Sequence, residues 1–330
     1  MLWDMNALKR RHVVCLNEFE YVGVSLATAH TLGLKKIKLE VECQTAYILV
    51  GSVCHAKCGF CGMSKKTERG LSRVKWPLFS KDVVLEALRE GVFSRKISRI
   101  CLQVTCSDTQ ELLREMIKVL CQLDIPISLS KSVTSVSEIE DYLELGVCKI
   151  TVNLDIITEK SYLQYKGINF KEKKKLLFDT AKKFPKKIVC HLIIGFDESE
   201  QECIELLDEL SKVGVTVGLF AFFPIKGTEL ENHSQPDVGK YRRVQIAKHL
   251  IEKGVGIEQF KFDEQGKLQK IESDLGAETE QLAKAFQTTG CEGCSRPYYT
   301  EKPRGTLYNF PYKPNINEVE QCMKESGLWK

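Results

Sequence analysis

The stretch Cys54-His55-Ala56-Lys57-Cys58-Gly59-Phe60-Cys61 stands directly after a short apolar run, Ala46–Val50. Its cysteines are spaced C-x3-C-x2-C, so one tight loop can bring three thiolates together. Three protein thiolates on a [4Fe-4S] cluster leave one iron open to an outside ligand. A zinc site needs a fourth ligand, and His55 is badly placed to complete the tetrahedron, so zinc is the weaker interpretation. The loop is therefore predicted to hold an open cluster.

Outward from this loop, short β-rich runs alternate with longer amphipathic runs, which is typical of a parallel α/β fold. No G-x-G-x-x-G follows the first strand, which disfavours a dinucleotide-binding open sheet. We therefore predict a partial (β/α)6 TIM-like barrel, in which functional residues follow the C-terminal ends of strands. The predicted strands are Ala46–Val50, Arg99–Thr105, Ile125–Ser130, Lys149–Asp155, Lys187–Gly195 and Thr216–Phe223, and the predicted helices are Lys81–Glu90, Asp108–Leu123, Ser137–Leu145, Lys171–Lys183, Ser199–Val213 and Val238–Lys253.

Length and composition describe an ordinary globular chain and exclude a disordered or fibrous one. The chain has 330 residues, of which 43% are apolar and 28% charged, so it can bury a full core. We predict an N-terminal extension over residues 1–44, the barrel over 45–256 and a C-terminal segment over 257–330. The end of this segment is rich in proline and glycine, and we expect it to wrap around the barrel instead of forming a domain.

Charge and hydropathy bear on partners and compartment. A net charge of +4 does not require a nucleic-acid partner. The longest apolar stretches are too short to cross a membrane, and no apolar run follows the basic N-terminal residues, so we expect a cytoplasmic protein. Fourteen cysteines then indicate metal ligation, not disulfides. The lysine-rich stretch from Lys171 to Lys187 is interpreted as a solvated helix face, with docking of an acidic partner as the alternative.

The cluster loop resembles the signature of the radical S-adenosylmethionine (SAM) superfamily, C-x3-C-x-aromatic-C, with Phe60 as the aromatic residue. The resemblance implies that Cys54, Cys58 and Cys61 hold a [4Fe-4S] cluster whose open iron binds the amino and carboxylate groups of SAM. It implies cleavage of SAM to a 5′-deoxyadenosyl radical that removes hydrogen from unactivated carbon. The protein then has to position that carbon and exclude water.

The stretch His191–Glu198 follows the superfamily pattern G-x-I-x-G-x-x-E, except that His191 replaces the first glycine. By this resemblance Ile193 faces the adenine of SAM, Gly195 allows a close approach of the backbone, and Glu198 lies nearby. The alternative is a buried strand followed by an acidic helix start. A single histidine on a buried strand is interpreted as a packed core residue.

Asn153 and Asp155 resemble the N-L-D segment of biotin synthase, whose side chains contact the SAM ribose. Two polar side chains two residues apart on one strand face can bond a diol together. The alternative is a strand end that passes into an Asp-capped turn. The glycine-glycine-glutamate element of many superfamily members is missing after the second strand, where the sequence from 103 to 107 reads QVTCS. The ligand of the SAM amino group is therefore not identified.

A second cysteine pair, Cys291 and Cys294, stands in a glycine- and proline-rich loop. Two thiolates need further ligands to hold a cluster, and Cys15 and Cys43 are candidates. Structural zinc or an unligated pair is the alternative, whereas a redox dithiol is disfavoured because no thioredoxin-like helix follows. Cys101, Cys121, Cys148, Cys190 and Cys203 fall in predicted elements and are interpreted as small buried hydrophobes.

With this pair, four further segments resemble the biotin synthase-related radical SAM proteins, and among them one subunit of the two-protein, split lipoyl synthases. The resemblance implies sulfur insertion at C6 or C8 of an octanoyl chain on a lipoyl carrier protein, with an auxiliary [4Fe-4S] cluster as the sulfur donor. It implies a second radical SAM subunit and an electron donor such as ferredoxin or flavodoxin. The four segments are Leu71–Pro77, Phe223–Thr228, Lys240–Arg243 and Arg304–Pro311.

The chain departs from single-chain lipoyl synthases, because it lacks their N-terminal three-cysteine motif. Alternative functions therefore stay open. One is a radical SAM enzyme with another outcome, such as a different sulfur insertion or a cofactor-maturation step. Another is a cluster-bearing partner subunit that does not cleave SAM. An RNA-modifying protein has only the lysine-rich stretch to support it.

Overall fold

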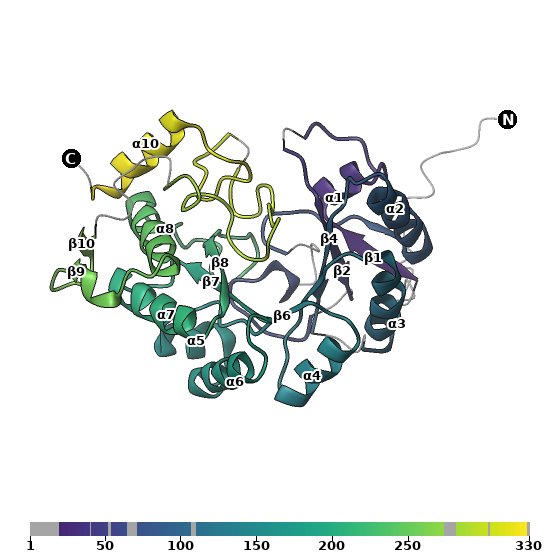
Figure 1. Ribbon diagram of the computed structural model, residues 1–330, viewed down its shortest axis with the longest axis horizontal. Coiled ribbons are helices and arrows are strands. Elements are labelled where there is room, and N and C mark those ends of the chain that lie inside the picture. The colour runs from purple at the N-terminus through teal and green to yellow at the C-terminus, as the bar shows by residue number, and fades with distance from the viewer. Residues whose placement is uncertain are drawn as a thin grey trace.

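The structure, a computed structural model, describes residues 20–39, 41–51, 54–64, 71–106, 110–273, 282–302 and 304–328. Its centre is an eight-stranded sheet in the order β3-β1-β2-β4-β5-β6-β7-β8. The strands from β2 through β4 to β8 are parallel, and helices surround them (Figure 1). The predicted α/β fold with a partial TIM-like barrel is confirmed. The strands are β1 (Tyr21–Val24), β2 (Thr45–Val50), β3 (Leu78–Ser80), β4 (Arg99–Val104), β5 (Ile127–Ser130), β6 (Lys149–Thr151), β7 (Ile188–Ile194) and β8 (Thr216–Ala221).

Helices follow most of the strands because each β-rich run is succeeded by an amphipathic run with a capping residue. Ser199, for example, forms a capping box with Glu202 at the start of α7, which satisfies backbone N–H groups that the helix itself leaves open. The helices are α1 (Leu26–Thr31), α2 (Lys81–Phe93), α3 (Gln110–Leu120), α4 (Val136–Glu144), α5 (Glu159–Lys166), α6 (Phe170–Lys183), α7 (Glu200–Lys212), α8 (Val238–Glu252) and α10 (Ile316–Ser326).

The two faces of the barrel differ in chemistry. Alternate residues of the strands, such as Ile48, Ile100 and Leu129, are fully buried in the main core, which lies between the sheet and the helices. The residues between them face the barrel interior and are largely polar or sulfur-containing. Tyr47, for example, pairs in register with Cys101. The barrel interior is therefore the part of the fold suited to chemistry.

Several predicted elements have other bounds in the structure, and two of them illustrate the difference. The predicted continuation of the fourth strand to Asp155 is wrong, because β6 ends at Thr151 and Asp155 has φ +62°, a left-handed conformation that a strand does not contain. The predicted helix Asp108–Leu123 is shorter at its end, where α3 stops at Leu120 and a 3-10 turn, Cys121–Leu123, follows. Residues 107–109 lie outside the described part of the chain.

Segments at both ends of the chain belong to the same structure. In the predicted N-terminal extension, β1 pairs antiparallel with both β2 and β3. A hairpin of β9 (Phe260–Phe262) and β10 (Leu268–Ile271) follows α8. Helix α10 packs against α8, and Figure 1 shows the C-terminal loops, in yellow, reaching from these helices toward the strands. The sequence did not predict α1, α5, α10 or this hairpin.

The C-terminal loop bridges the open side of the partial barrel. The Thr289 hydroxyl accepts a hydrogen bond from the backbone N–H of Leu219 in β8 (2.9 Å). On the other side, the Thr45 hydroxyl in β2 donates to the carbonyl of Gly293 (2.9 Å). The loop thus pairs with β8, an edge strand whose backbone groups would otherwise be exposed, and ties it to β2.

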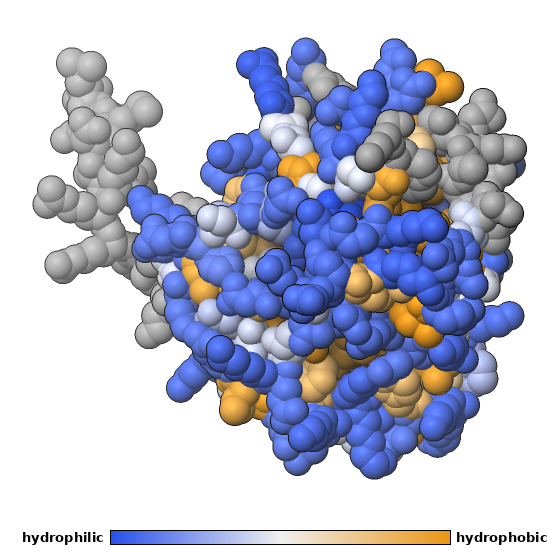
Figure 2. Space-filling model, turned by 90° about the vertical axis from the view of Figure 1, so that its left-hand side faces the viewer, coloured by the Kyte–Doolittle hydropathy of each residue, from blue (hydrophilic) through white to orange (hydrophobic). Residues whose placement is uncertain are grey.

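The surface shown in Figure 2 is largely hydrophilic with small, separate hydrophobic patches. On the lysine-rich helix α6, Lys174 pairs with Glu209 and Lys175 with Asp179, as expected of a solvated helix face. Within the ranges that the structure describes, no helix combines the length and the apolar character needed to cross a membrane.

A buried ion pair joins α7, α8 and the chain end. Arg243 binds both carboxylate oxygens of Glu200 (2.7 and 2.8 Å) and donates to the carbonyl of Ser326. Glu200 and Arg243 are 4% and 7% exposed. Because removal of one partner leaves a buried charge alone, Arg243→Met should lower the free energy of unfolding by about 3–5 kcal/mol.

The matched control is Arg114→Met, which removes the exposed pair between Arg114 and Asp141 and should cost less than about 1 kcal/mol. Denaturant titration of both variants measures the difference. Equal losses of unfolding free energy in the two variants would show that the buried pair stabilises the fold no more than the exposed pair does.

Candidate functional site

The cysteine loop lies at the C-terminal end of β2, where a parallel barrel carries its functional residues. Three backbone hydrogen bonds fix it to neighbouring segments. His55 donates to the carbonyl of Cys106 after β4 (2.8 Å), Gly59 donates to Tyr165 in α5 (2.8 Å), and Leu230 donates to Gly59 (3.3 Å). The loop is therefore held from three sides without using the thiols of Cys54, Cys58 and Cys61.

These thiols suit a metal cluster. The pKa of Cys58 is raised to about 12 and that of Cys61 to about 11, chiefly by burial, and the neighbouring thiols and Asp155 act in the same direction. Each thiolate thus needs a cation beside it, and metal binding supplies one by displacing the proton. The described ranges contain no group of three or more His, Cys, Asp or Glu side chains that could hold a single metal ion. Four irons span more space than one ion, so their ligands stand farther apart.

An aromatic wall stands beside the loop. The Phe60 ring meets the Phe196 ring edge-on (5.3 Å between centroids). Phe196 in turn contacts Tyr165 and Phe222, and Ile193 packs against the same group. Such a wall excludes water and offers an apolar surface to a flat ring.

A polar group faces this wall from the end of β6. The Asn153 side-chain oxygen accepts from the backbone N–H of His191 (3.0 Å). Asp155 forms a 2.5 Å ion pair with Lys166, a residue that the sequence analysis missed. Burial alone would lower the pKa of Lys166, but the Asp155 carboxylate raises it above its ordinary value. Lys166 stands four residues after Tyr162, so both lie on one face of α5. Predicting this helix from the sequence would have brought the two residues together.

The Tyr162 hydroxyl is fully buried and has no hydrogen-bond partner among the described residues. The Lys166 ammonium lies 5.0 Å from the centre of the Tyr162 ring. A buried hydroxyl without a partner costs free energy, so a polar ligand bound beside Asp155 and Lys166 would satisfy it. These residues therefore fit a polar ligand such as SAM.

Gly195 and Glu198 form a rigid turn after β7. The Glu198 carboxylate accepts from the backbone N–H groups of Gly195 (2.9 Å) and Phe196 (2.8 Å) and pairs with Lys240 (2.8 Å). Gly195 has φ +127°, and a Cβ there would lie 2.9 Å from the Cβ of Phe222. Glu198 thus shapes the turn, and the turn requires glycine.

The second cysteine pair lies inside the barrel. The Cys294 sulfur is 3.3 Å from the Tyr47 hydroxyl, and the Cys291 sulfur is 3.4 Å from the Ser128 hydroxyl. Cys43 is buried, with its sulfur 3.9 Å from the hydroxyl of Ser295. Cys15 lies outside the described residues. The structure therefore brings Cys43 to the Cys291–Cys294 loop, while Cys15 stays a prediction.

Both cysteine sets contact one buried group of side chains in the barrel. This inner cluster contains Tyr47, Leu49, Met63, Trp76 and Tyr299. Cys54 and Cys61 pack against it, and so do Cys101 and Cys294, while Cys43 is one of its buried members. The two sites are thus parts of one interior.

Arg296, which the sequence analysis also missed, enters this interior directly after the cysteine pair. Its guanidinium lies 3.7 Å above the Phe220 ring, and its Nε and Nη1 atoms have no hydrogen-bond partner among the described residues. Burial lowers the pKa of His191 to about 3, and the positive charge of Arg296 acts in the same direction. This imidazole is therefore neutral at pH 7. The sequence signal for Arg296 was a basic residue close to the Cys-x2-Cys pair.

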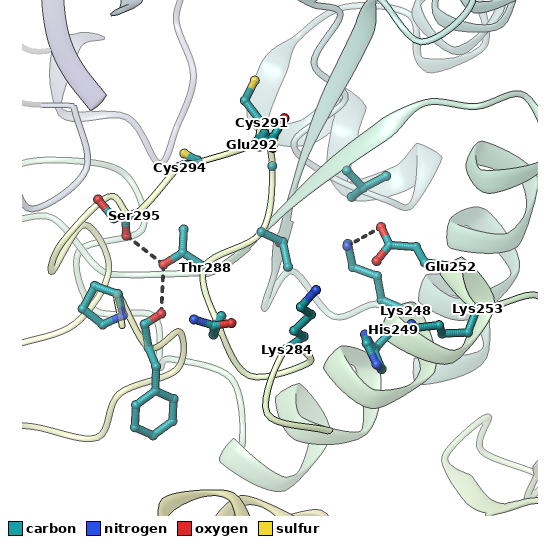
Figure 3. Close-up of a pocket in the computed structure, with 17 residues that line it drawn as sticks. Lys248, His249, Glu252, Lys253, Lys284, Thr288, Cys291, Glu292, Cys294 and Ser295 are labelled. Atoms are coloured by element: carbon teal, nitrogen blue, oxygen red, sulfur yellow. Dashed lines mark hydrogen bonds and ion pairs between the residues drawn. The ribbon is translucent and has the colours of Figure 1, made fainter. Parts of the chain in front are cut away.

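A cavity of about 610 Å³ opens beside the Cys291–Cys294 loop. Figure 3 shows Cys291, Cys294 and Ser295 along the loop on one side of it and Lys248, His249 and Glu252 on α8 on the other. Lys248 pairs with Glu252 (2.7 Å). The cavity lets small solutes approach the cysteine loop from its outer side.

Comparison with known proteins places the chain by sequence. The Radical SAM superfamily model matches residues 48–210. The uncharacterized protein MJ0785 of Methanocaldococcus jannaschii is 26% identical over 208 residues, which cover 60% of this chain and 53% of that protein. The chain thus spans about half the length of the curated relative that it matches.

Solved structures share the fold. The FeFe-hydrogenase maturase HydG from Carboxydothermus hydrogenoformans has a TM-score of 0.52 and 16% identity, covering 69% of this chain and 56% of that one. A second structure of HydG, a maturase of the [FeFe]-hydrogenase, has a TM-score of 0.50 and 10% identity, covering 68% of this chain and 60% of that one. With the family match and the cysteine loop at the end of β2, residues 48–210 are a radical SAM superfamily domain.

Proposed function

We propose that the chain is a radical SAM sulfurtransferase that inserts sulfur at C6 or C8 of an octanoyl chain on a lipoyl carrier protein, forming the lipoyl cofactor. It works with a second radical SAM subunit and an electron donor of the ferredoxin or flavodoxin class. The supporting observation is that two separate cysteine sets pack against one inner cluster. Because such clusters need reduced thiolates, we place the reaction in the cytoplasm.

On the SAM side, Cys54, Cys58 and Cys61 are the ligands of a [4Fe-4S] cluster. When bound, this cluster supplies the electron that cleaves SAM to a 5′-deoxyadenosyl radical. Phe60 and Phe196 exclude water from the site by their edge-on contact. Such exclusion protects a reactive radical from unwanted hydrogen donors.

Polar residues orient SAM above the barrel. Asp155 and Asn153 bind the ribose, and Lys166 fixes the Asp155 carboxylate through their ion pair. Ile193 packs against the adenine, and the turn at Gly195, held by Glu198, lets the backbone approach it. The packing of Ile193 and Phe60 in one aromatic group supports this arrangement.

On the other side of the inner cluster, Cys291 and Cys294 are ligands of an auxiliary [4Fe-4S] cluster. That cluster, when bound, supplies the sulfur of the product. Tyr47 and Ser128 position the two thiols from β2 and β5. The acyl-lysyl arm of the carrier reaches into the barrel interior that both cysteine sets share.

Cys58→Ala should abolish SAM cleavage, because the change removes one of three ligands of the SAM-binding cluster. The measurement is 5′-deoxyadenosine formed by the reconstituted protein under reductant. Cys322→Ala is the control, since Cys322 is buried in the main core. SAM cleavage at the wild-type rate by Cys58→Ala would refute the assignment of the loop.

The double variant Cys291→Ala, Cys294→Ala should still cleave SAM but insert no sulfur, since it leaves the first cysteine loop intact. Both products can be followed in one assay, 5′-deoxyadenosine by chromatography and the carrier by mass spectrometry. Loss of both activities would instead indicate that the pair is structural.

Gly195→Ala should raise the Kd for SAM by about tenfold or more, because the left-handed backbone and the contact with Phe222 cost about 1–3 kcal/mol. Gly214→Ala is the matched control, since Gly214 has φ +70° but nothing within 4 Å of an added Cβ. Equilibrium binding measures the Kd for SAM of both variants. An equal rise in Kd would show that SAM binding does not depend on a close approach of the backbone at Gly195.

The function itself is tested by incubating the reconstituted chain with SAM, a reductant, the second subunit and an octanoylated carrier. Mass spectrometry of the carrier should show added sulfur. Formation of 5′-deoxyadenosine with no sulfur on the carrier would favour another sulfur insertion or a cofactor-maturation reaction. No 5′-deoxyadenosine from the isolated chain would favour a non-catalytic iron-sulfur partner subunit.

A further inference from the structure

Cys101 lies between the two residues that contact the second cysteine pair. On the sheet, Cys101 of β4 is in register with Tyr47 of β2 and with Ser128 of β5. Residues in register on neighbouring strands point to the same face and stand about 5 Å apart. Tyr47 touches the sulfur of Cys294 (3.3 Å) and Ser128 touches that of Cys291 (3.4 Å). The strand register therefore places the Cys101 thiol beside both loop thiols.

Cys43 approaches the same place from the segment before β2. It is 2% exposed and a member of the inner cluster, against which Cys101 and Cys294 pack. Ser295, whose hydroxyl is 3.9 Å from the Cys43 sulfur, directly follows Cys294. Four thiols from three separate segments thus converge inside the barrel.

The group includes polar atoms that lack partners among the described residues. The Tyr299 hydroxyl is one, and the Nε and Nη1 atoms of Arg296 are the others. Both residues are 7% exposed. A buried guanidinium with free donors is costly unless an anion lies beside it. A cluster held by four thiolates carries net negative charge and sulfur acceptors, so it supplies the missing partner.

The hydrogen bonds around the loop favour thiolates as well. The Tyr47 hydroxyl oxygen accepts from the backbone N–H groups of Ser295 (3.2 Å) and Arg296 (3.0 Å). Its own hydrogen is then directed to the Cys294 sulfur. Gln103 donates in the same way to the Cys101 sulfur (3.0 Å). Both sulfurs already receive donors, as cluster ligands commonly do.

We propose that Cys43, Cys101, Cys291 and Cys294 together hold the auxiliary [4Fe-4S] cluster, and that Arg296 donates hydrogen bonds to its sulfur atoms. This inference rests on the proposed function, which assigned that cluster to Cys291 and Cys294 alone. It departs from the sequence-based interpretation of Cys101 as a small buried hydrophobe.

The test is iron and sulfide counting, with Mössbauer spectra, on the reconstituted chain and on the double variant Cys43→Ala, Cys101→Ala, which leaves only two of the four thiols. The wild type should hold about eight irons, and the double variant about four. SAM cleavage should persist in the double variant, which shows that it folds and keeps the first cluster. Cys121→Ala is the control, because Cys121 contacts Leu145 and Gly146 on the outer side of the sheet, and it should keep about eight.

Retention of about eight irons by the double variant overturns the four-thiol set. A wild-type count of about four irons has a different meaning, because it removes the auxiliary cluster and with it the sulfur source of the proposed function. The two failures are therefore distinguishable.

Arg296→Met gives a second readout that does not depend on losing a ligand. The iron count should stay at about eight, while the reduction potential of one cluster falls, because a positive charge beside it stabilises the reduced form. Arg296→Lys should restore part of the shift. An EPR-monitored redox titration measures it, and unchanged potentials in Arg296→Met would contradict the proposed contact.

Discussion

The Tyr47 hydroxyl joins the barrel to the segment that closes it. It accepts two backbone N–H groups of the C-terminal loop and touches the Cys294 sulfur, and its ring is fully buried. Because a six-stranded partial barrel leaves one side open, something outside the parallel strands has to fill it. Here the filling loop carries thiols and an arginine. The loop that closes the barrel therefore also forms the second site.

That arrangement explains why the interior is polar while the outer face of the sheet is not. Register places Tyr47, Cys101 and Ser128 on one inner row, and each contacts or neighbours a loop thiol. A core built for stability alone would fill this row with aliphatic side chains. The polar row lowers stability unless a ligand occupies it, and the atoms of Arg296 and Tyr299 that lack partners among the described residues mark the cost.

The proposed SAM site is built differently, because its residues hold each other in place. Lys166 holds Asp155, and Glu198 holds the turn at Gly195. The inner cluster around Tyr47 lies between this site and the second cysteine set. A substrate chain that reaches into the barrel would thus meet both sites in one enclosed space, which suits a reaction in which a radical and a sulfur donor act on one carbon chain.

The α/β class and the cysteine loop could be predicted from the sequence, because both are local: strand and helix periods repeat along the chain, and three cysteines stand within eight residues. The spacing also identified Cys291 and Cys294, and Cys43 was one candidate partner for them. That Cys101 and Arg296 meet the pair needed the tertiary structure, since strand register and loop closure bring together residues far apart in the chain. The end of β6 also needed the fold, because the left-handed Asp155 is held by contacts with β7 and Lys166 that no local pattern encodes.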